Sequence, residues 1–206
     1  KNRGIDVVFD EKMDDLEVYR LWQEGKSFGI FQFESGGITS FMKELKPDCF
    51  EDIVAGVSLY RPGPMDQIPR YIKGKLNPGH NEYTHPSLEP ILNVTYGCMV
   101  YQEQVMQIVR DLAGYSLGRA DLVRRAMGKK KLDVMAKERE VFIHGQVDEE
   151  GNVVVPGCVR NGIDEESANK IFDEMSEFAK YAFNKSHAAA YAVISYRTAY
   201  LKAYYK

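Results

Sequence analysis

The sequence predicts a mainly α-helical fold with a little β structure. In the second half of the chain, apolar residues recur every three to four positions, as they do on one face of a helix. Glycines and prolines follow several of these segments, where helices commonly end. Three valines at 153–155 come soon after Gly151 in a polar stretch, and this pattern is typical of a small hairpin or an exposed loop.

The first half is expected to contain short helices, one strand and a stiff corner. Near-helical spacing of apolar residues predicts helices at residues 16–25, 38–45 and 49–60. Phe31 and Phe33 alternate with polar neighbours, which predicts a strand at 28–33 that ends at a glycine pair. Residues 61–64 read Arg-Pro-Gly-Pro, and the two prolines restrict the backbone there. Residues 74–90 contain three prolines and are expected to form a loop.

The second half is expected to form four main helical segments. Apolar spacing over residues 101–112 predicts a helix that ends at Gly114, and a second helix runs from about residue 132 to Gly145. Residues 148–157 are expected to form the hairpin. Asp164 is a suitable cap for the next helix, and an alanine-rich final helix is expected to start near Ser186.

Charge is segregated along the chain. The 206 residues carry a formal net charge of -3, which argues against nucleic-acid binding through overall charge. Residues 119–139 nevertheless hold eight Lys or Arg against three acids, a balance of +5. Residues 148–177 hold nine acids against two cations, a balance of -7. Any phosphate contact is therefore expected to come from a local basic segment.

Composition predicts neither a metal site nor a membrane span. Cys49, Cys98 and Cys158 are far apart and odd in number, which is typical of free buried thiols in a reducing compartment. The four histidines lack ligand spacing, and the acid pairs at 14–15 and 51–52 are expected at solvated positions. Without a long apolar run or a signal sequence, we expect a cytoplasmic protein. The chain opens at a lysine and ends within a helical pattern, so we expect a fragment.

The most informative segment is residues 183–191, at the start of the final helix. Asn184 or Ser186 can cap the helix, and the positive end of a helix favours phosphate oxygens. Residues 178–206 contain no Asp or Glu that would repel a triphosphate. The alternative is a capped helix whose alanines permit close packing while its lysines are merely solvated. A hydrolase site at Ser186 and His187 is disfavoured, because neighbouring residues at a helix start do not face one another.

Two other groups of cations are candidates for phosphate contacts. Residues 118–131 present several arginines and lysines from one helix turn and the bend at Gly128, and arginine offers a planar fork for phosphate. The alternative is an exposed charged helix. Arg61 is either held toward a ligand by the Pro-Gly-Pro corner or engaged in a salt bridge.

Several of these segments closely resemble one family. In chain order they are GIFQFES (29–35), LYRPGPM (59–65), VYQEQVM (100–106), LAGYSLG (112–118), RRAMGKKK (124–131) and FNKSHAAAY (183–191). They are similar to the bacterial replicative C-family DNA polymerases, the family of the DNA polymerase III α subunits, over nearly the whole chain. Lys180 and Ala182 stand where that family commonly has glycines.

The resemblance implies the end of the palm at residues 1–37 and a helical fingers domain at 38–206. It implies fingers that position an incoming deoxynucleoside triphosphate and the template for transfer to a primer 3′-hydroxyl. Arg124 and Arg125 would then lie near the triphosphate, and Lys185 and His187 near the nascent base pair. The metal-binding carboxylates of the palm lie upstream in the family, so Mg²⁺ is expected outside this chain and the chain alone is expected to be inactive.

These patterns and the resemblance give two sets of site residues, with none catalytic and none binding a metal. The predicted nucleotide-binding residues are Arg61, Arg124, Arg125, Lys129, Lys185, Ser186, His187 and Tyr191. The predicted DNA-binding residues are Arg119, Lys130 and Lys131. Expected partners are the nucleotide, primer-template DNA, other polymerase domains and replisome subunits. The alternative functions are a non-catalytic module that binds the DNA backbone and a replisome interaction module that uses the acidic segment.

Overall fold

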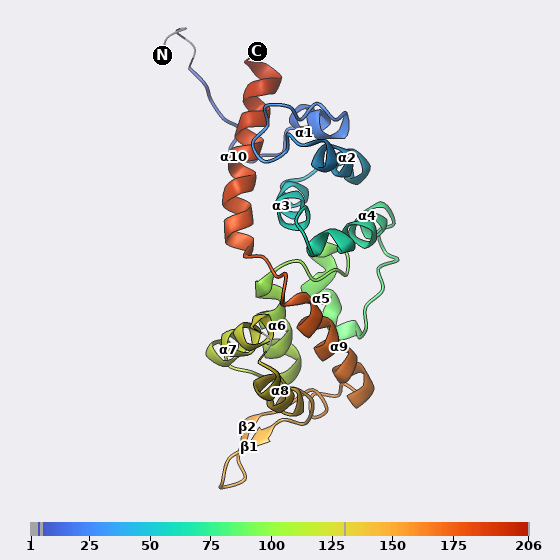
Figure 1. Cartoon of the computed structure of the whole chain (residues 1–206), viewed down its shortest axis with the longest axis vertical. Coiled ribbons are helices and arrows are strands. Elements are labelled where there is room, and N and C mark those ends of the chain that lie inside the picture. The colour runs from blue at the N-terminus through green and yellow to red at the C-terminus, as the bar shows by residue number, and fades with distance from the viewer. Residues whose placement is uncertain (1–3, 5, 130, 206) are drawn as a thin grey trace. The chain divides into compact units, whose positions relative to one another are not determined.

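The computed structural model describes residue 4 and residues 6–129 and 131–205 (Figure 1). The chain forms two compact units, each described by itself. Unit 1 consists of Lys1–Tyr60 and Lys185–Lys206, and unit 2 consists of Arg61–Asn184. The described residues form ten α-helices and one two-stranded sheet, so the predicted mainly α fold is confirmed. Among them, no helix combines the length and the apolar character that a membrane crossing requires.

Unit 1 is built from four helices around an aromatic core. They are α1 (Leu16–Gln23), α2 (Gly36–Leu45), α3 (Phe50–Leu59) and α10 (Lys185–Tyr204). Tyr19 and Trp22 on α1 are fully buried, and the Tyr19 ring lies 5.7 Å from that of Tyr196 on α10. Helix α10 packs against α1 and α3, and Figure 1 shows it running beside them. Its buried face includes Ala188 and Ala192, small residues that allow close approach between helices.

The predicted strand at residues 28–33 is wrong, because this segment forms successive turns. Gly29 and Gln32 have φ values of +78° and +68°, in the left-handed region that a strand excludes. The backbone finds a partner outside any sheet, since the Phe31 N–H donates to Thr198 Oγ1 on α10 at 3.1 Å. The alternation of the phenylalanines therefore does not produce a strand, because two residues are left-handed and the backbone bonds to a side chain of α10.

Unit 2 contains the other helices and the hairpin. Its α-helices are α4 (Ile68–Leu76), α5 (Glu89–Leu92), α6 (Gln102–Ala113), α7 (Leu117–Gly128), α8 (Leu132–His144) and α9 (Glu165–Phe178). Short 3₁₀ turns lie at η1 (Pro64–Gln67), η2 (Pro86–Leu88) and η3 (Asn93–Thr95). The helices α5, α6, α7, α8 and α9 share one apolar core. Ile108, Phe142 and Phe172 are among its most buried side chains. The expected loop at 74–90 is correct only in part, because α4 extends to Leu76 and η2 begins at Pro86.

The predicted helix ends in unit 2 are confirmed. Gly114 follows α6 in the left-handed conformation at φ +78°, where its N–H donates to Arg110 O. Gly145 is the residue after α8, and its N–H donates to Val141 O. The Asp164 carboxylate caps α9 by accepting a hydrogen bond from Ser167 N at 2.8 Å. Local chemistry therefore sets where these helices start and stop.

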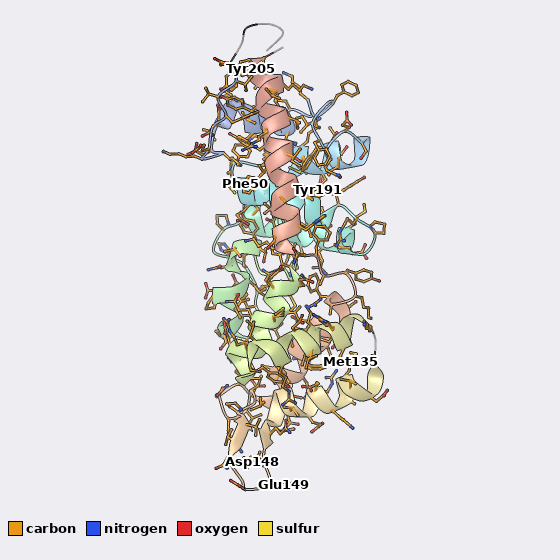
Figure 2. All side chains as sticks on the ribbon, turned by 90° about the vertical axis from the view of Figure 1, so that its left-hand side faces the viewer. Phe50, Met135, Asp148, Glu149, Tyr191 and Tyr205 are labelled. Carbon is orange, nitrogen blue, oxygen red and sulfur yellow. The ribbon has the colours of Figure 1, made fainter. Side chains whose placement is uncertain are left out.

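The predicted hairpin is also confirmed. Strands β1 (Gln146–Val147) and β2 (Val153–Val155) pair in antiparallel fashion, with Gln146 opposite Val155. Figure 2 shows Asp148 and Glu149 at the tip of the hairpin. Asp148 closes the turn, because its carboxylate accepts from Asn152 N at 2.8 Å.

Candidate functional site

Arg61, at the Pro-Gly-Pro corner, is tied to the segment that precedes α10. Its Nη2 donates to Tyr181 O at 2.8 Å, and its guanidinium carbon lies 4.1 Å from the centroid of the Phe183 ring. Partial burial lowers the pKa of Arg61 from its usual value. Gly63 has φ +102°, and a Cβ there would lie 2.2 Å from the Tyr181 ring. Glycine therefore permits the close approach that lets Arg61 reach this segment.

The same segment is bonded to residues 100–104. Phe183 forms a parallel bridge with Tyr101, and Gln102 N donates to Phe183 O at 2.9 Å. The buried Gln104 side chain accepts from the backbone N–H groups of residues 100 and 101 at 2.8 and 2.9 Å. Asn184 Nδ2 donates to Glu103 Oε1 at 2.9 Å. We call Arg61, Gly63, residues 100–104 and residues 181–184 the motif junction, since three segments that carried the family resemblance meet there.

Arg124 and Arg125 on α7 share one carboxylate. Arg124 Nη2 lies 2.7 Å from Asp121 Oδ1, and Arg125 Nε lies 2.8 Å from Asp121 Oδ2. Hydrogen bonds from Arg124, together with those from Arg125, lower the pKa of Asp121. Arg124 also donates from Nη1 to Gln102 Oε1 at 3.0 Å, which connects α7 to the motif junction.

The two arginines differ in exposure. The Arg125 side chain is 63% exposed, as the basic run predicted, whereas that of Arg124 is only 23% exposed. Arg125 contacts Asp121 through Nε, and a guanidinium carries five N–H donors, so Arg125 keeps donors for a further partner. Arg124 is the anchored member of the pair and Arg125 the accessible one. Sequence reasoning missed Asp121 and Gln102, although Asp121 stands three and four positions before the arginines it holds.

Arg119, predicted to contact DNA, is engaged within unit 2. Its guanidinium donates to Gln146 Oε1 at 2.6 Å and to Glu138 Oε1 at 3.2 Å, and it lies 5.0 Å from the Tyr115 ring centroid. These contacts join α7 to α8 and the hairpin, which favours a structural role. Lys129 and Lys131 are exposed. Lys130 lies outside the described residues.

The predicted anion site at the start of α10 lies in unit 1. Ser186 and His187 are exposed, and the His187 ring centroid lies 4.4 Å from that of Tyr191. Lys185 Nζ pairs with Glu51 Oε2 at 3.1 Å. Residues 178–206 contain no acid, but in the folded chain α3 brings the Glu51 carboxylate next to the first turn of α10. An incoming phosphate would compete with Glu51 for Lys185.

The predicted nucleotide-binding residues are thus divided between the units. Unit 2 carries Arg61, Arg124, Arg125 and Lys129, of which Arg61 and Arg124 both reach the motif junction. Unit 1 carries Lys185, Ser186, His187 and Tyr191. Their role in nucleotide binding stays a prediction, as does the boundary between palm and fingers at residue 37.

A cavity of about 240 Å³ opens beside the motif junction and is lined in part by Gly63 and Tyr181. Three acids, Asp66, Glu174 and Glu177, line it against a single cation, Arg70. This balance disfavours a triphosphate, so the cavity is not the phosphate site.

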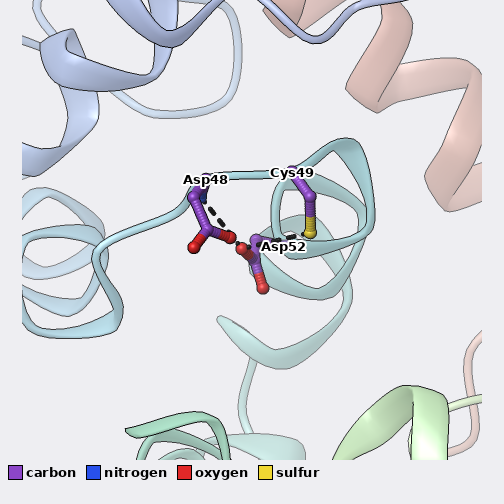
Figure 3. A group of neighbouring side chains, drawn as sticks. All are labelled: Asp48, Cys49 and Asp52. Carbon is purple, nitrogen blue, oxygen red and sulfur yellow. Dashed lines mark hydrogen bonds between the residues drawn. The ribbon is translucent and has the colours of Figure 1, made fainter.

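Asp48, Cys49 and Asp52 gather at the start of α3 (Figure 3). Their potential ligand atoms lie within 4.8 Å of one another, so they are the described residues best placed to hold a metal ion. Local hydrogen bonds account for the cluster: the Asp52 carboxylate accepts from Asp48 N at 3.1 Å and from Cys49 Sγ at 3.4 Å. Asp52 is fully buried, so the expectation of a solvated residue was wrong.

The three cysteines are free thiols, although only two of them are buried as predicted. Burial raises the pKa of the Cys98 thiol to about 11 and that of the Cys158 thiol to about 12. Both therefore stay protonated near neutral pH and behave as small apolar residues. Cys49 is exposed, and its thiol donates to the Asp52 carboxylate at the start of α3.

Comparison with known proteins identifies the family. Residues 1–150 match the model of the bacterial DNA polymerase III α subunit finger domain. The chain is 48% identical over its whole length to the DNA polymerase III subunit α of Thermus aquaticus, of which it covers 16%. It is 53% identical over 94% of its length to that of Chlamydia trachomatis, covering 15%, and 49% identical over 94% to that of Halalkalibacterium halodurans, covering 16%. The chain spans about one sixth of the length of these relatives. It belongs to the family of bacterial DNA polymerase III α subunits, within their finger domain.

Proposed function

We propose that this chain is the fingers region of a replicative DNA-directed DNA polymerase of the bacterial cytoplasm. It positions an incoming deoxynucleoside triphosphate and the template for phosphoryl transfer to the primer 3′-hydroxyl. Family membership supports the polymerase. The observation that carries the nucleotide role is the arginine pair on α7, in which Asp121 holds two guanidinium groups and leaves Arg125 exposed.

The pair suits phosphate binding because one arginine, Arg124, is anchored within unit 2 and the other, Arg125, is exposed to a ligand. Arg124 is held by Asp121 and by Gln102 of the motif junction, so this side of α7 stays fixed to α6. Arg125 presents a planar fork that matches two phosphate oxygens, while Asp121 limits its rotamers before the ligand arrives. Its positive charge neutralises charge on the leaving phosphates of the nucleotide. Lys129, exposed one turn further along, adds a mobile cation.

The start of α10 carries the predicted phosphate ligands of unit 1 and is considered by itself. Its first-turn amides carry the positive end of a twenty-residue helix, and Lys185 stands at its first position. Glu51 holds Lys185 in the absence of nucleotide, and a triphosphate displaces that carboxylate because it carries more charge. His187 and Tyr191 form an aromatic surface next to this turn.

The magnesium ions that the family implies do not fit the described residues. Magnesium prefers oxygen ligands in octahedral geometry. The cluster of Asp48, Cys49 and Asp52 instead contains a thiol, and its buried carboxylate accepts from Asp48 N. We therefore assign Mg²⁺ to palm residues outside this chain. Primer-template DNA, other polymerase domains and replisome subunits are the partners, and the 206 residues alone are expected to polymerise nothing.

Steady-state kinetics of the full-length α subunit carrying this chain test the proposal. Arg125→Ala should lower kcat/KM about 10- to 150-fold for all four nucleotides alike, because a phosphate contact contributes about 1.5 to 3 kcal/mol and carries no base information. The kcat/KM of Arg125→Lys should lie between those of Arg125→Ala and the wild type, because lysine keeps the positive charge but lacks the planar guanidinium. Arg160→Ala removes another exposed arginine of unit 2 and should leave kcat/KM unchanged.

Two results would contradict the proposal. Early melting of Arg125→Ala with normal kinetics in the folded fraction would make Arg125 a structural ion-pair member. Weaker DNA binding with a steep salt dependence and an unchanged nucleotide KM would favour the module that binds only the DNA backbone.

A further inference from the structure

A second cavity in unit 2, of about 360 Å³, lies between α4 and the loop that follows it. Arg70, Lys73 and Gly74 come from α4. The other lining residues are Asn77, His80, Asn81, Glu82 and Tyr96. It shares Arg70 with the acidic cavity beside the motif junction, but its lining is basic overall. None of the residues predicted to bind nucleotide or DNA lines it.

The cations of this cavity are available for a ligand. Arg70 Nη2 donates to the backbone oxygen of Glu82 at 3.3 Å, a bond that orients the guanidinium without neutralising it. Within the described part of the chain, no acidic side chain pairs with Arg70 or Lys73, whereas Lys170, an exposed lysine of α9, pairs with Glu166 at 2.7 Å. His80 adds an imidazole to the lining. Glu82 is the one acid among the lining residues.

Gly74 and Tyr96 bring an aromatic side chain to the lining of the cavity. A Cβ on Gly74 would lie 2.6 Å from Tyr96 Cβ and 2.8 Å from Asn81 Oδ1, so only glycine lets α4 approach Tyr96 and Asn81 this closely. The Tyr96 ring is positioned by an edge contact with the buried Tyr71, at 5.0 Å between centroids. Tyr96 itself is only half-buried, which leaves part of it facing the cavity.

Unpaired cations beside an aromatic surface are the combination that holds single-stranded nucleic acid, because the cations contact phosphates while bases stack on the ring. We propose that this cavity binds one nucleotide of a single strand, with its phosphate on Arg70 and Lys73 and its base against Tyr96. The inference rests on the proposed function, since it makes the strand the unpaired template ahead of the primer end. It adds a contact remote in sequence from the basic run on α7.

The test measures binding of the full-length α subunit to fluorescent primer-templates by anisotropy. One duplex carries a 12-nucleotide single-stranded template extension and the other a single nucleotide. Lys73→Glu should weaken binding of the long extension about two- to fivefold, the size of one exposed ion contact, and leave the short one unchanged. The slope of log affinity against log salt should become less negative by about 0.7, the value for one phosphate of a single strand.

Lys170→Glu is the matched control, because it makes the same change in net charge on an exposed lysine of unit 2. Lys170→Glu should leave the affinity for both primer-templates unchanged. Equal weakening of both substrates by Lys73→Glu, or none of either, overturns the proposal. Inorganic phosphate or pyrophosphate, added at constant ionic strength, should not remove the difference between wild type and Lys73→Glu. If it does, the cavity holds a free phosphate and the single-strand assignment is wrong.

Nucleotide kinetics keep this inference separate from the proposed function. Lys73→Glu at saturating DNA should retain the wild-type KM for each nucleotide, whereas Arg125→Ala should not. A normal Arg125→Ala enzyme would reject the nucleotide role of α7 while the anisotropy result still decides whether the cavity binds a single strand.

Discussion

Replacing Arg61 by alanine should loosen the motif junction. In the structure the guanidinium donates to Tyr181 O and stacks on Phe183, so both contacts hold the segment that leads to α10. A hydrogen bond from a charged group contributes about 1.5 kcal/mol at the lower end of its range, which suits a half-exposed side chain. The cation–π contact adds about 0.5 kcal/mol. The loss is therefore about 2 kcal/mol, or about a 30-fold increase in local opening.

Hydrogen exchange of the full-length α subunit measures this opening directly. Peptides that cover residues 100–104 and 181–184 should exchange about 30-fold faster in Arg61→Ala, because Gln102 N–H is bonded to Phe183 O. Peptides from the hairpin at 146–155 provide the internal control. Unchanged exchange at 181–184 together with a raised nucleotide KM would refute the reasoning, since Arg61 would then contact the ligand itself.

Two further predictions concern α7 and the corner. Asp121→Asn should lower the free energy of unfolding by about 0.5 to 1 kcal/mol at pH 7. The folded-state pKa of Asp121 is depressed, so its contribution is present above the unfolded pKa of about 3.9 and is lost as pH falls through the folded value. The difference in urea midpoint between wild type and Asp121→Asn should thus shrink below about pH 4, and a constant difference would contradict the ion-pair role. Gly63→Ala should destabilise the protein by about 1 to 3 kcal/mol through its positive φ and the clash with Tyr181. Gly118→Ala, with open space around the new Cβ, should not, and equal melting temperatures of the two variants would contradict this account.

Local chemistry made much of the fold predictable. A single residue type determines each helix end at Gly114 and Asp164, because glycine alone adopts the left-handed conformation at low cost and aspartate accepts from a free helix amide. Apolar spacing likewise indicated α6 and α9. The mistaken strand at 28–33 had equally clear alternation, but its conformation depends on Thr198, which is 167 residues away from its partner.

The electrostatics of the candidate site were less predictable, since the partners of its cations come from other elements. The pairing of Asp121 with Arg124 and Arg125 could have been predicted, because the three residues are three and four positions apart on one helix. Glu51 reaches Lys185 from α3, and Gln102 reaches Arg124 from α6, so neither pair has a spacing that the sequence displays. Family resemblance pointed to these cations, but only the fold separates the anchored Arg124 from the accessible Arg125.

The structure of the full-length α subunit with primer-template DNA and an incoming nucleotide tests the central claim most directly. The proposal predicts triphosphate oxygens within about 3.2 Å of the Arg125 guanidinium. It also predicts that Lys185 has left Glu51 for the phosphate. A triphosphate bound elsewhere, with Arg125 on the DNA backbone and Lys185 still paired with Glu51, would contradict it.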